Sequence, residues 1–176
     1  MTCLFNFYGA PSSGKTTAAA MAFVYAKKHG FSAALVQEYA TELILAGKEE
    51  LLLNQPLLFE EQLRRIQISY GKVDFIMVDS PLLLNVVFHR LRTPVPDKEF
   101  EQRVIDADKE FCQKNILLAY HPERYSAYGR VTTRNDSFMI DQFIKNVLKE
   151  TQSPYIEFDS LENLENNLNT IFKKGE

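Results

Sequence analysis

Short apolar runs alternate along the chain with longer segments in which apolar residues recur every three to four positions. The short runs are expected to be strands, and they are TCLFNFY at 2–8, AALVQE at 33–38, VDFIMVD at 73–79, NILLAY at 115–120 and YIEFD at 155–159. Such a pattern is expected when crossover helices join parallel strands. It therefore predicts one five-stranded parallel sheet.

Four longer segments are expected to be helices. Residues 14–29 are rich in Ala and follow a glycine loop, while 56–70, 139–148 and 161–171 carry apolar residues at helical spacing, the last behind a Ser160 cap. Right-handed crossovers place such helices on both faces of the sheet. The sequence predicts a three-layer α/β/α fold as one domain, 1–176, with its ligand crevice at the carboxyl ends of the strands.

A phosphate-binding motif follows the first predicted strand. Residues 9–16, GAPSSGKT, match GxxxxGK[ST], and the motif lies between a strand and a helix as it requires. Its glycines let backbone N–H groups turn towards phosphate oxygens, and the helix N-terminus adds partial positive charge. Lys15 is expected to contact the β- and γ-phosphates of ATP, and the Thr16 hydroxyl to bind Mg²⁺. The residues expected to bind the nucleotide are Gly9, Pro11, Ser12, Ser13, Gly14, Lys15 and Thr16, with Thr17 near the phosphates.

Two acidic residues stand at the ends of predicted strands. Asp79 ends the third strand, where its carboxylate would be a second Mg²⁺ contact; capping a helix that starts near Pro81 is the alternative, and the two roles can coexist. Glu38 ends the second strand and is the candidate base that orients or deprotonates the attacking hydroxyl. A glutamate that only favours a helix N-terminus is the alternative there. We predict that Lys15, Glu38 and Asp79 act in catalysis.

A long basic loop follows the fourth predicted strand. The segment HPERYSAYGRVTTRND holds Arg124, Arg130 and Arg134, and loops this long in compact domains are usually functional lids or disordered segments. As a lid over about 122–135, it would bring Arg124 and Arg130 to the transferred phosphoryl group and Arg134 to the nucleotide, while excluding water. A solvated basic loop paired with surface acids is the alternative.

Charge and cysteine usage narrow the possible partners. The net charge of −3 gives no global drive towards nucleic acid, although a local basic cleft is compatible with it. Cys3 and Cys112 lack metal-ligand spacing and are expected to be buried, reduced thiols of a cytoplasmic protein. No apolar run approaches the roughly 20 residues that span a bilayer, and the first run lacks signal-peptide features. We expect no membrane association.

Several motifs together resemble a known family. The chain resembles the P-loop kinases and NTPases grouped with the nicotinamide riboside kinase domain and the small AAA-like ATPases of bacteriophages. The segments that carry the resemblance are YGAPSSGKTT, QEYATELI, FEEQLRRIQ, DSPLL and YSAYGR. The resemblance implies that residues 13–16 bind nucleotide, that Glu38 and Asp79 flank the acceptor and the metal, and that the lid arginines close on the phosphates. Similar phage proteins include deoxynucleotide kinases and kinases of hydroxymethylpyrimidines within DNA, so the resemblance implies a phage source.

The chain departs from two related groups. Asp79-Ser80-Pro81 stands where deoxynucleoside kinases have an acidic-Arg-Ser triplet, so the acceptor does not follow from that likeness. The chain also lacks the arginine-finger and sensor architecture of AAA motors, which argues against a ring-forming mechanical ATPase.

These features predict a kinase that transfers the γ-phosphate of Mg·ATP to a nucleoside, a nucleotide or a related hydroxyl. The residues expected around the acceptor are Glu38, Tyr39, Phe59, Arg64 and Asp79, with Arg64 clamping an acceptor phosphate where there is one. A kinase of modified bases or ends in DNA and a nucleotide-gated ATPase or regulatory module are the alternatives. The sequence leaves open the acceptor, the choice of ATP or GTP, and the oligomeric state.

Overall fold

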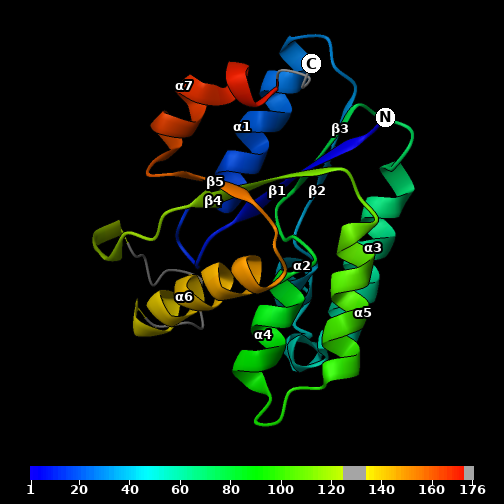
Figure 1. Ribbon diagram of the computed structural model, residues 1–176, viewed down its shortest axis with the longest axis vertical. Helices are drawn as coiled ribbons and strands as arrows, with labels where there is room; N and C mark the ends of the chain where they lie inside the picture. The colour runs from blue at the N-terminus through cyan, green and yellow to red at the C-terminus, as the bar shows by residue number, and fades with distance from the viewer. Residues whose placement is uncertain (125–133, 173–176) are drawn as a thin grey trace.

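The computed structural model describes residues 1–124 and 134–172. Within them, five strands form one parallel sheet in the order β2-β3-β1-β4-β5 (Figure 1). The strands are β1 (Cys3–Tyr8), β2 (Ala33–Val36), β3 (Phe75–Val78), β4 (Gln113–Leu118) and β5 (Tyr155–Phe158). All five predicted strands are confirmed, and their ends differ from the predicted ones by at most two residues.

Helices cover both faces of this sheet, which confirms the three-layer prediction (Figure 1). One face carries α1 (Lys15–Lys28) and α7 (Leu161–Ile171), and the other carries α3 (Gln55–Ser69), α4 (Leu84–Arg92), α5 (Lys98–Lys109) and α6 (Arg134–Glu150). The shorter elements are α2 (Tyr39–Leu45) and the 3₁₀ turns η1 (Glu49–Leu53) and η2 (Pro122–Arg124). Ser160 caps α7 as expected, through its hydroxyl and the N–H of Asn163.

The central strand β1 shows why the strands are almost continuously apolar. Phe5 and Phe7 point into the core beneath α1 and α7, whereas Leu4 and Tyr8 point into the core on the opposite face. Successive side chains of a strand alternate between faces, and here both faces are buried. The sheet is therefore the middle layer of the fold and separates two cores.

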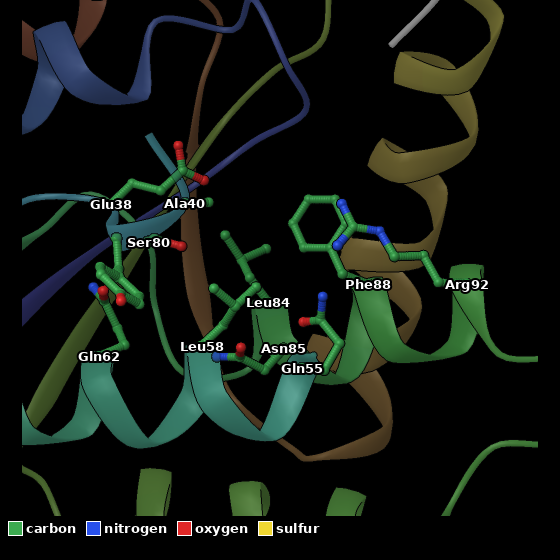
Figure 2. Close-up of a pocket in the computed structure, with 11 residues that line it drawn as sticks. Glu38, Ala40, Gln55, Leu58, Gln62, Ser80, Leu84, Asn85, Phe88 and Arg92 are labelled. Atoms are coloured by element: carbon green, nitrogen blue, oxygen red, sulfur yellow. The ribbon is translucent and has the colours of Figure 1, made fainter. Parts of the chain in front are cut away.

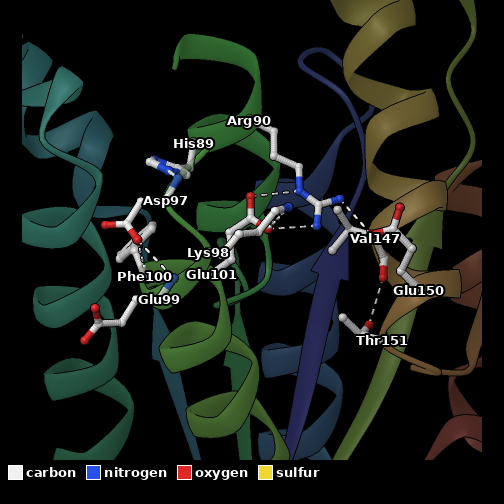
Figure 3. Close-up of polar contacts among 10 residues, drawn as sticks. All are labelled: His89, Arg90, Asp97, Lys98, Glu99, Phe100, Glu101, Val147, Glu150 and Thr151. Atoms are coloured by element: carbon white, nitrogen blue, oxygen red, sulfur yellow. Dashed lines mark hydrogen bonds and ion pairs between the residues drawn. The ribbon is translucent and has the colours of Figure 1, made fainter. Parts of the chain in front are cut away.

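An ion-pair network ties the helices on the α3–α6 face together (Figure 3). Arg90 of α4 donates from Nη2 to Glu101 Oε2 of α5 at 2.9 Å and from Nη1 to Glu150 Oε2 of α6 at 2.7 Å. Lys98 adds a 3.2 Å contact to Glu101, which is only 3% exposed. One guanidinium thus links three helices that follow one another in the chain.

The two cysteines differ from the expectation. Cys112 is exposed and Cys3 is half-buried, so the expectation of two buried thiols was wrong. Cys112 immediately precedes β4, where its side chain is exposed. Across the described ranges, no helix combines the length and the apolar character needed to cross a bilayer.

Candidate active site

The loop between β1 and α1 has a backbone that only glycine fits at two positions. Gly9 has φ of 151°, and a Cβ placed there would lie 2.3 Å from Ser13 Oγ and 3.0 Å from the Leu118 carbonyl oxygen. Gly14 has φ of 92° and is the N-cap residue of α1, so no side chain caps the first turn. A helix N-terminus of this kind offers N–H donors and partial positive charge to an anion.

Lys15 lies across this loop. Its Nζ donates to the carbonyl oxygens of Gly9 at 2.9 Å and Ala10 at 3.3 Å. Residues 11–15 are half-buried and Thr16 is exposed, so the predicted phosphate-binding residues form one loop with a solvent-facing side. Thr17 is also exposed and lines a groove between α1 and α7, so it lies further from this loop than the residues before it.

Asp79 directly follows β3, which pairs with β1, and so it lies next to the loop. It is 5% exposed, and its Oδ1 has no hydrogen-bond partner in the described part of the chain. Burial raises the pKa of Asp79, while hydrogen bonding with Thr16 and the charge of Lys15 act in the opposite direction. Asp79 is not a helix cap, because α4 begins at Leu84 with Leu83 as its N-cap residue.

Thr16 and Asp79 suit a Mg²⁺ ion. Carboxylate and hydroxyl oxygens are the hard donors that Mg²⁺ prefers, and it usually combines one or two protein ligands with phosphate oxygens and waters. The orphaned Oδ1 of Asp79 fits this role. Residues 1–124 and 134–172 hold no cluster of three or more His, Cys, Asp or Glu side chains that would form a metal site of their own.

Glu38 occupies the N-cap position of α2, just after β2. Its Oε2 accepts a 2.9 Å hydrogen bond from the Thr41 hydroxyl, and its side chain lines a pocket beside Ser80. The negative charge of Glu38 also contributes to the pKa values of Asp79 and Arg92. Its backbone thus starts a helix, as one interpretation of the sequence held, while its side chain lines the pocket.

The pocket lies between α2, α3 and α4 and has a volume of about 70 Å³ (Figure 2). Figure 2 shows Glu38 near one end and Phe88 with Arg92 near the other. Small-molecule sites usually have roughly 300–1,000 Å³, so an acceptor of nucleoside size requires these helices to move apart. The lining residues are Glu38, Tyr39, Ala40, Gln55, Leu58, Gln62, Ser80, Leu84, Asn85, Phe88 and Arg92.

Three of the residues predicted around the acceptor do not line this pocket, and one of them is Asp79, which lies beside the phosphate-binding loop. Phe59 is 1% exposed and packs edge-to-face on Phe100, with ring centres 6.0 Å apart, so it belongs to the core. The Arg64 side chain is 59% exposed and bonds to Glu61 at 2.7 Å, so it lies on the outer face of α3. The helical period was predicted correctly, but the side of α3 that lines the pocket is neither the Phe59 side nor the Arg64 side. It is the side that carries Gln62.

Sequence reasoning missed the polar side chains on that face. Gln62 is 3% exposed, and its Nε2 has no hydrogen-bond partner among the described residues. Gln55 Nε2 donates to the Leu52 carbonyl at 3.1 Å, and Asn85 Nδ2 donates to the Leu82 carbonyl at 3.0 Å. Buried amides at otherwise apolar positions of two amphipathic helices were the signal, because buried polar groups need a partner.

Arg92 was also missed, because its pocket position depends on where α4 ends. Its Nη1 donates to the Leu52 carbonyl at 2.5 Å, and its guanidinium carbon lies 5.1 Å from the centre of the Phe88 ring. Burial lowers the pKa of Arg92, and the charge of Glu38 opposes this effect. The pocket therefore places a cation opposite the Glu38 carboxylate.

The lid prediction lies largely outside the described residues. Arg130 and most of the segment 122–135 are in the undescribed range, as are the side chains of Arg124, the last residue of η2, and Arg134, the first residue of α6. η2 follows β4 at the start of the segment, and α6 begins at its end.

Comparison with known proteins adds a family and a set of similar folds. Residues 4–164 match the family described as AAA domain. A shorter segment is 37% identical over 83 residues to RecA of Xylella fastidiosa, strains M23 and Temecula1. That match covers 43% of this chain and 24% of RecA, so it spans about a quarter of these curated relatives.

Solved structures with the same fold include named kinases. Deoxyadenosine kinase from M. mycoides superposes with a TM-score of 0.65 at 14% identity, covering 96% of this chain and 98% of the kinase. Thymidylate kinase from Ehrlichia chaffeensis gives 0.66 at 11% identity, covering 98% and 100%. The NadR protein in complex with NAD and AMP-PNP gives 0.71 at 14% identity, covering 97% of this chain and 48% of NadR.

At these identities the structural neighbours establish the fold, which is the α/β fold of P-loop NTPases. The family match is the stronger assignment, because it covers most of the sequence from β1 into α7. On this basis the chain belongs to the AAA domain family of P-loop NTPases.

Proposed function

We propose that this protein is a kinase that transfers the γ-phosphate of Mg·ATP to a hydroxyl or phosphate of a nucleoside-like acceptor. One observation carries the proposal. The phosphate-binding loop and the pocket lined by Glu38 both lie at the same edge of the sheet. Phosphoryl transfer needs this juxtaposition of a phosphate site and an acceptor site, since catalysis is mostly positioning and charge neutralisation. The fold shared with deoxyadenosine kinase and thymidylate kinase supports the same function.

On the nucleotide side, the backbone N–H groups of residues 9–16 bind the phosphates, and the Lys15 ammonium leaves the carbonyls of its own loop to contact them. Thr16 and Asp79 hold Mg²⁺ through the hydroxyl and the orphaned carboxylate oxygen. When bound, Mg²⁺ neutralises charge on the phosphate oxygens. ATP is the proposed donor.

On the acceptor side, Glu38 takes up the proton of the attacking hydroxyl. The Thr41 hydroxyl orients the Glu38 carboxylate. Tyr39 forms a flat wall for a ring, while Gln62 and Arg92 present donors to oxygen atoms of the acceptor.

Further features complete the proposal. Arg124, Arg130 and Arg134 are proposed to belong to a lid that closes over the phosphates and excludes water. The chain is proposed to act as one domain in the cytoplasm, and the likeness of its motifs to phage kinases supports a phage source. ATP, Mg²⁺ and a nucleoside-like acceptor are its proposed ligands.

The test is transfer of γ-labelled phosphate from ATP to a panel of nucleosides, nucleotides, nicotinamide riboside, and plain and hydroxymethylated DNA. We expect label on one small acceptor, loss of that label in Lys15→Ala, and about a 10²–10⁴-fold slower transfer in Glu38→Gln. Glu49→Gln is the matched control, because Glu49 is an exposed glutamate of η1 outside the pocket.

Other outcomes point to the alternatives. Label on DNA alone would favour a DNA kinase, whose activity should fall steeply with salt. Label released only as free phosphate across the whole panel would favour a nucleotide-gated ATPase. Unchanged transfer by Glu38→Gln would remove Glu38 as the base.

A further inference from the structure

Cys3 and Cys112 lie opposite each other on neighbouring strands, far apart in the sequence. β1 and β4 pair in parallel with Leu4 opposite Gln113, so the residues immediately before this pair are the two cysteines. The N–H of Leu4 donates to the Cys112 carbonyl oxygen at 2.8 Å, so the pairing continues to Cys112. Neighbouring strands lie roughly 4.8 Å apart, which falls within the Cα separation of about 4.4–6.8 Å found in disulfides.

The two side chains also point to the same face of the sheet. Cys3 packs against the core cluster of Phe5, on the α1 and α7 face. Cys112 stands an even number of residues before Ile116, which belongs to that same cluster. The Cys112 side chain lies close enough to Cys3 to raise the pKa of the Cys3 thiol.

We propose that Cys3 and Cys112 form a dithiol site, which closes to an intramolecular disulfide with a disulfide oxidant and binds soft ligands that take two thiolates. Cys112 is the exposed member and reacts first. Burial raises the pKa of the half-buried Cys3 to about 12, with the hydrogen bond to Cys112 and the proximity of its charge acting in the same direction and the charge of Lys114 opposing them. Cys3 is thus the protected, resolving thiol.

The reaction with glutathione disulfide balances in two exchanges. The Cys112 thiolate attacks one sulfur of glutathione disulfide, forming a mixed disulfide and releasing one glutathione thiolate. The Cys3 thiolate then attacks the Cys112 sulfur and releases the second glutathione thiolate. The two cysteines are oxidised, glutathione disulfide is reduced to two glutathione molecules, and the protons of both cysteines pass to the released thiolates.

This site is remote from the proposed kinase site. The cysteines lie at the amino ends of β1 and β4, whereas the phosphate-binding loop leaves the carboxyl end of β1. A disulfide would enclose the chain from Cys3 to Cys112 in one loop that contains the phosphate-binding loop, Glu38 and Asp79. Closing so long a loop is expected to raise thermal stability without changing the nucleotide site.

The full chain is incubated with glutathione buffers of increasing oxidising strength, then alkylated and digested without reduction. We expect one peptide pair linked through Cys3 and Cys112, simultaneous loss of both free thiols, a rise in melting temperature of about 5–10 °C, and ATP binding changed less than about twofold. Cys3→Ser and Cys112→Ser are the matched controls and should show neither the link nor the temperature shift. Glutathione attached to Cys112 while Cys3 is still alkylated at every potential would overturn the proposal.

A second probe needs no oxidant and no variant. Phenylarsine oxide reacts with two thiols, forming two As–S bonds and releasing its oxygen with the two thiol protons as one water molecule, so it reports two thiols within reach of one atom. We expect one equivalent to protect both cysteines of the native protein from alkylation. Protection of neither cysteine, or of Cys112 alone, would overturn the proposed dithiol site even if the kinase assay succeeds.

Discussion

The Arg65 guanidinium lies over the Tyr39 ring, with its central carbon 4.8 Å from the ring centre. Arg65 is held there by Glu42, which accepts from Nη1 at 2.5 Å and Nη2 at 2.7 Å, and by Glu61, which accepts from Nε at 2.8 Å. The bond to Glu42, with that to Glu61, raises the pKa of Arg65. The pKa of Glu61 is lowered to about 2, chiefly by its hydrogen bond to Arg64, and the bond to Arg65 acts in the same direction. Since Tyr39 lines the pocket, Arg65 positions one of its walls.

Arg65→Lys should raise the KM for the acceptor about three- to tenfold and leave acceptor-independent ATP hydrolysis unchanged. Lysine cannot reproduce the planar fork that bonds Glu42 and Glu61 while covering Tyr39, and a cation–π contact is worth roughly 0.5–1 kcal/mol or more. Steady-state kinetics for acceptor and ATP separate the two effects. Arg64→Lys is the control, and an equal KM in both variants would contradict a positioning role for Arg65.

Gln62→Met should weaken acceptor binding and leave the fold at least as stable. A lost hydrogen bond to the acceptor corresponds to about a tenfold rise in KM, whereas removing a buried donor without a partner should add up to about 1 kcal/mol of stability. Kinetics and urea unfolding measure the two quantities. Gln67→Met, at an exposed position of the same helix, should change neither. Loss of stability with an unchanged KM would show that Gln62 is structural.

Asp79→Asn should raise the Mg²⁺ concentration needed for half-maximal turnover by at least about tenfold, because metal affinity falls by roughly 10–100-fold when a site loses part of its ligand shell. The neutral amide is a weaker ligand for a hard cation. Activity is measured against Mg²⁺ concentration, and ATP binding is measured in EDTA as the internal control. An unchanged Mg²⁺ requirement would exclude Asp79 as a ligand.

Asp108→Asn should stabilise the protein at neutral pH. Burial raises the pKa of Asp108 to about 6, although the Gln113 side chain donates to its Oδ2 at 2.9 Å and Lys109 adds a favourable charge. The unfolded value is about 3.9, so the folded state holds this proton more tightly between about pH 4 and 6. The contribution of Asp108 to the free energy of unfolding therefore falls as pH rises through that window.

At pH 8 the Asp108→Asn variant should be about 1–3 kcal/mol more stable than the parent, because one pKa unit corresponds to roughly 1.4 kcal/mol. Below about pH 4 the two proteins should converge. Urea unfolding across pH 4–8 measures this difference. Asp106→Asn alters an exposed carboxylate of the same helix and serves as the control. Parallel pH profiles for the parent and Asp108→Asn would contradict the prediction.

Glu101→Gln should destabilise the protein by about 3 kcal/mol, because it leaves a partly buried guanidinium without its main charge partner. Arg90 bonds both oxygens of Glu101 (Figure 3). For a chain of this length, the loss corresponds to a drop in melting temperature of roughly 6–12 °C. Calorimetry tests it, with Glu99→Gln on the same helix as the control. A drop of the same size in the control would attribute the effect to α5 as a whole.

The sequence by itself determined the elements and the nucleotide loop. Short apolar runs and the helical period depend only on neighbouring residues, so the five strands and the helices from residues 15 to 28, 55 to 69 and 161 to 171 could be predicted within a few positions. The GxxxxGK[ST] spacing carries its own backbone chemistry, and the positive φ of Gly9 and Gly14 follows from it. The family motifs led to the same P-loop fold.

Only the tertiary structure decided which residues share a site. Phe59 and Gln62 stand on one helix, and their assignment to core and pocket depends on how α3 rotates against α2 and α4, which its own period does not specify. Arg92 reaches the pocket from the end of α4, and Cys3 meets Cys112 only because β4 pairs with β1. Such contacts join segments distant in the sequence, and strand order and register set them.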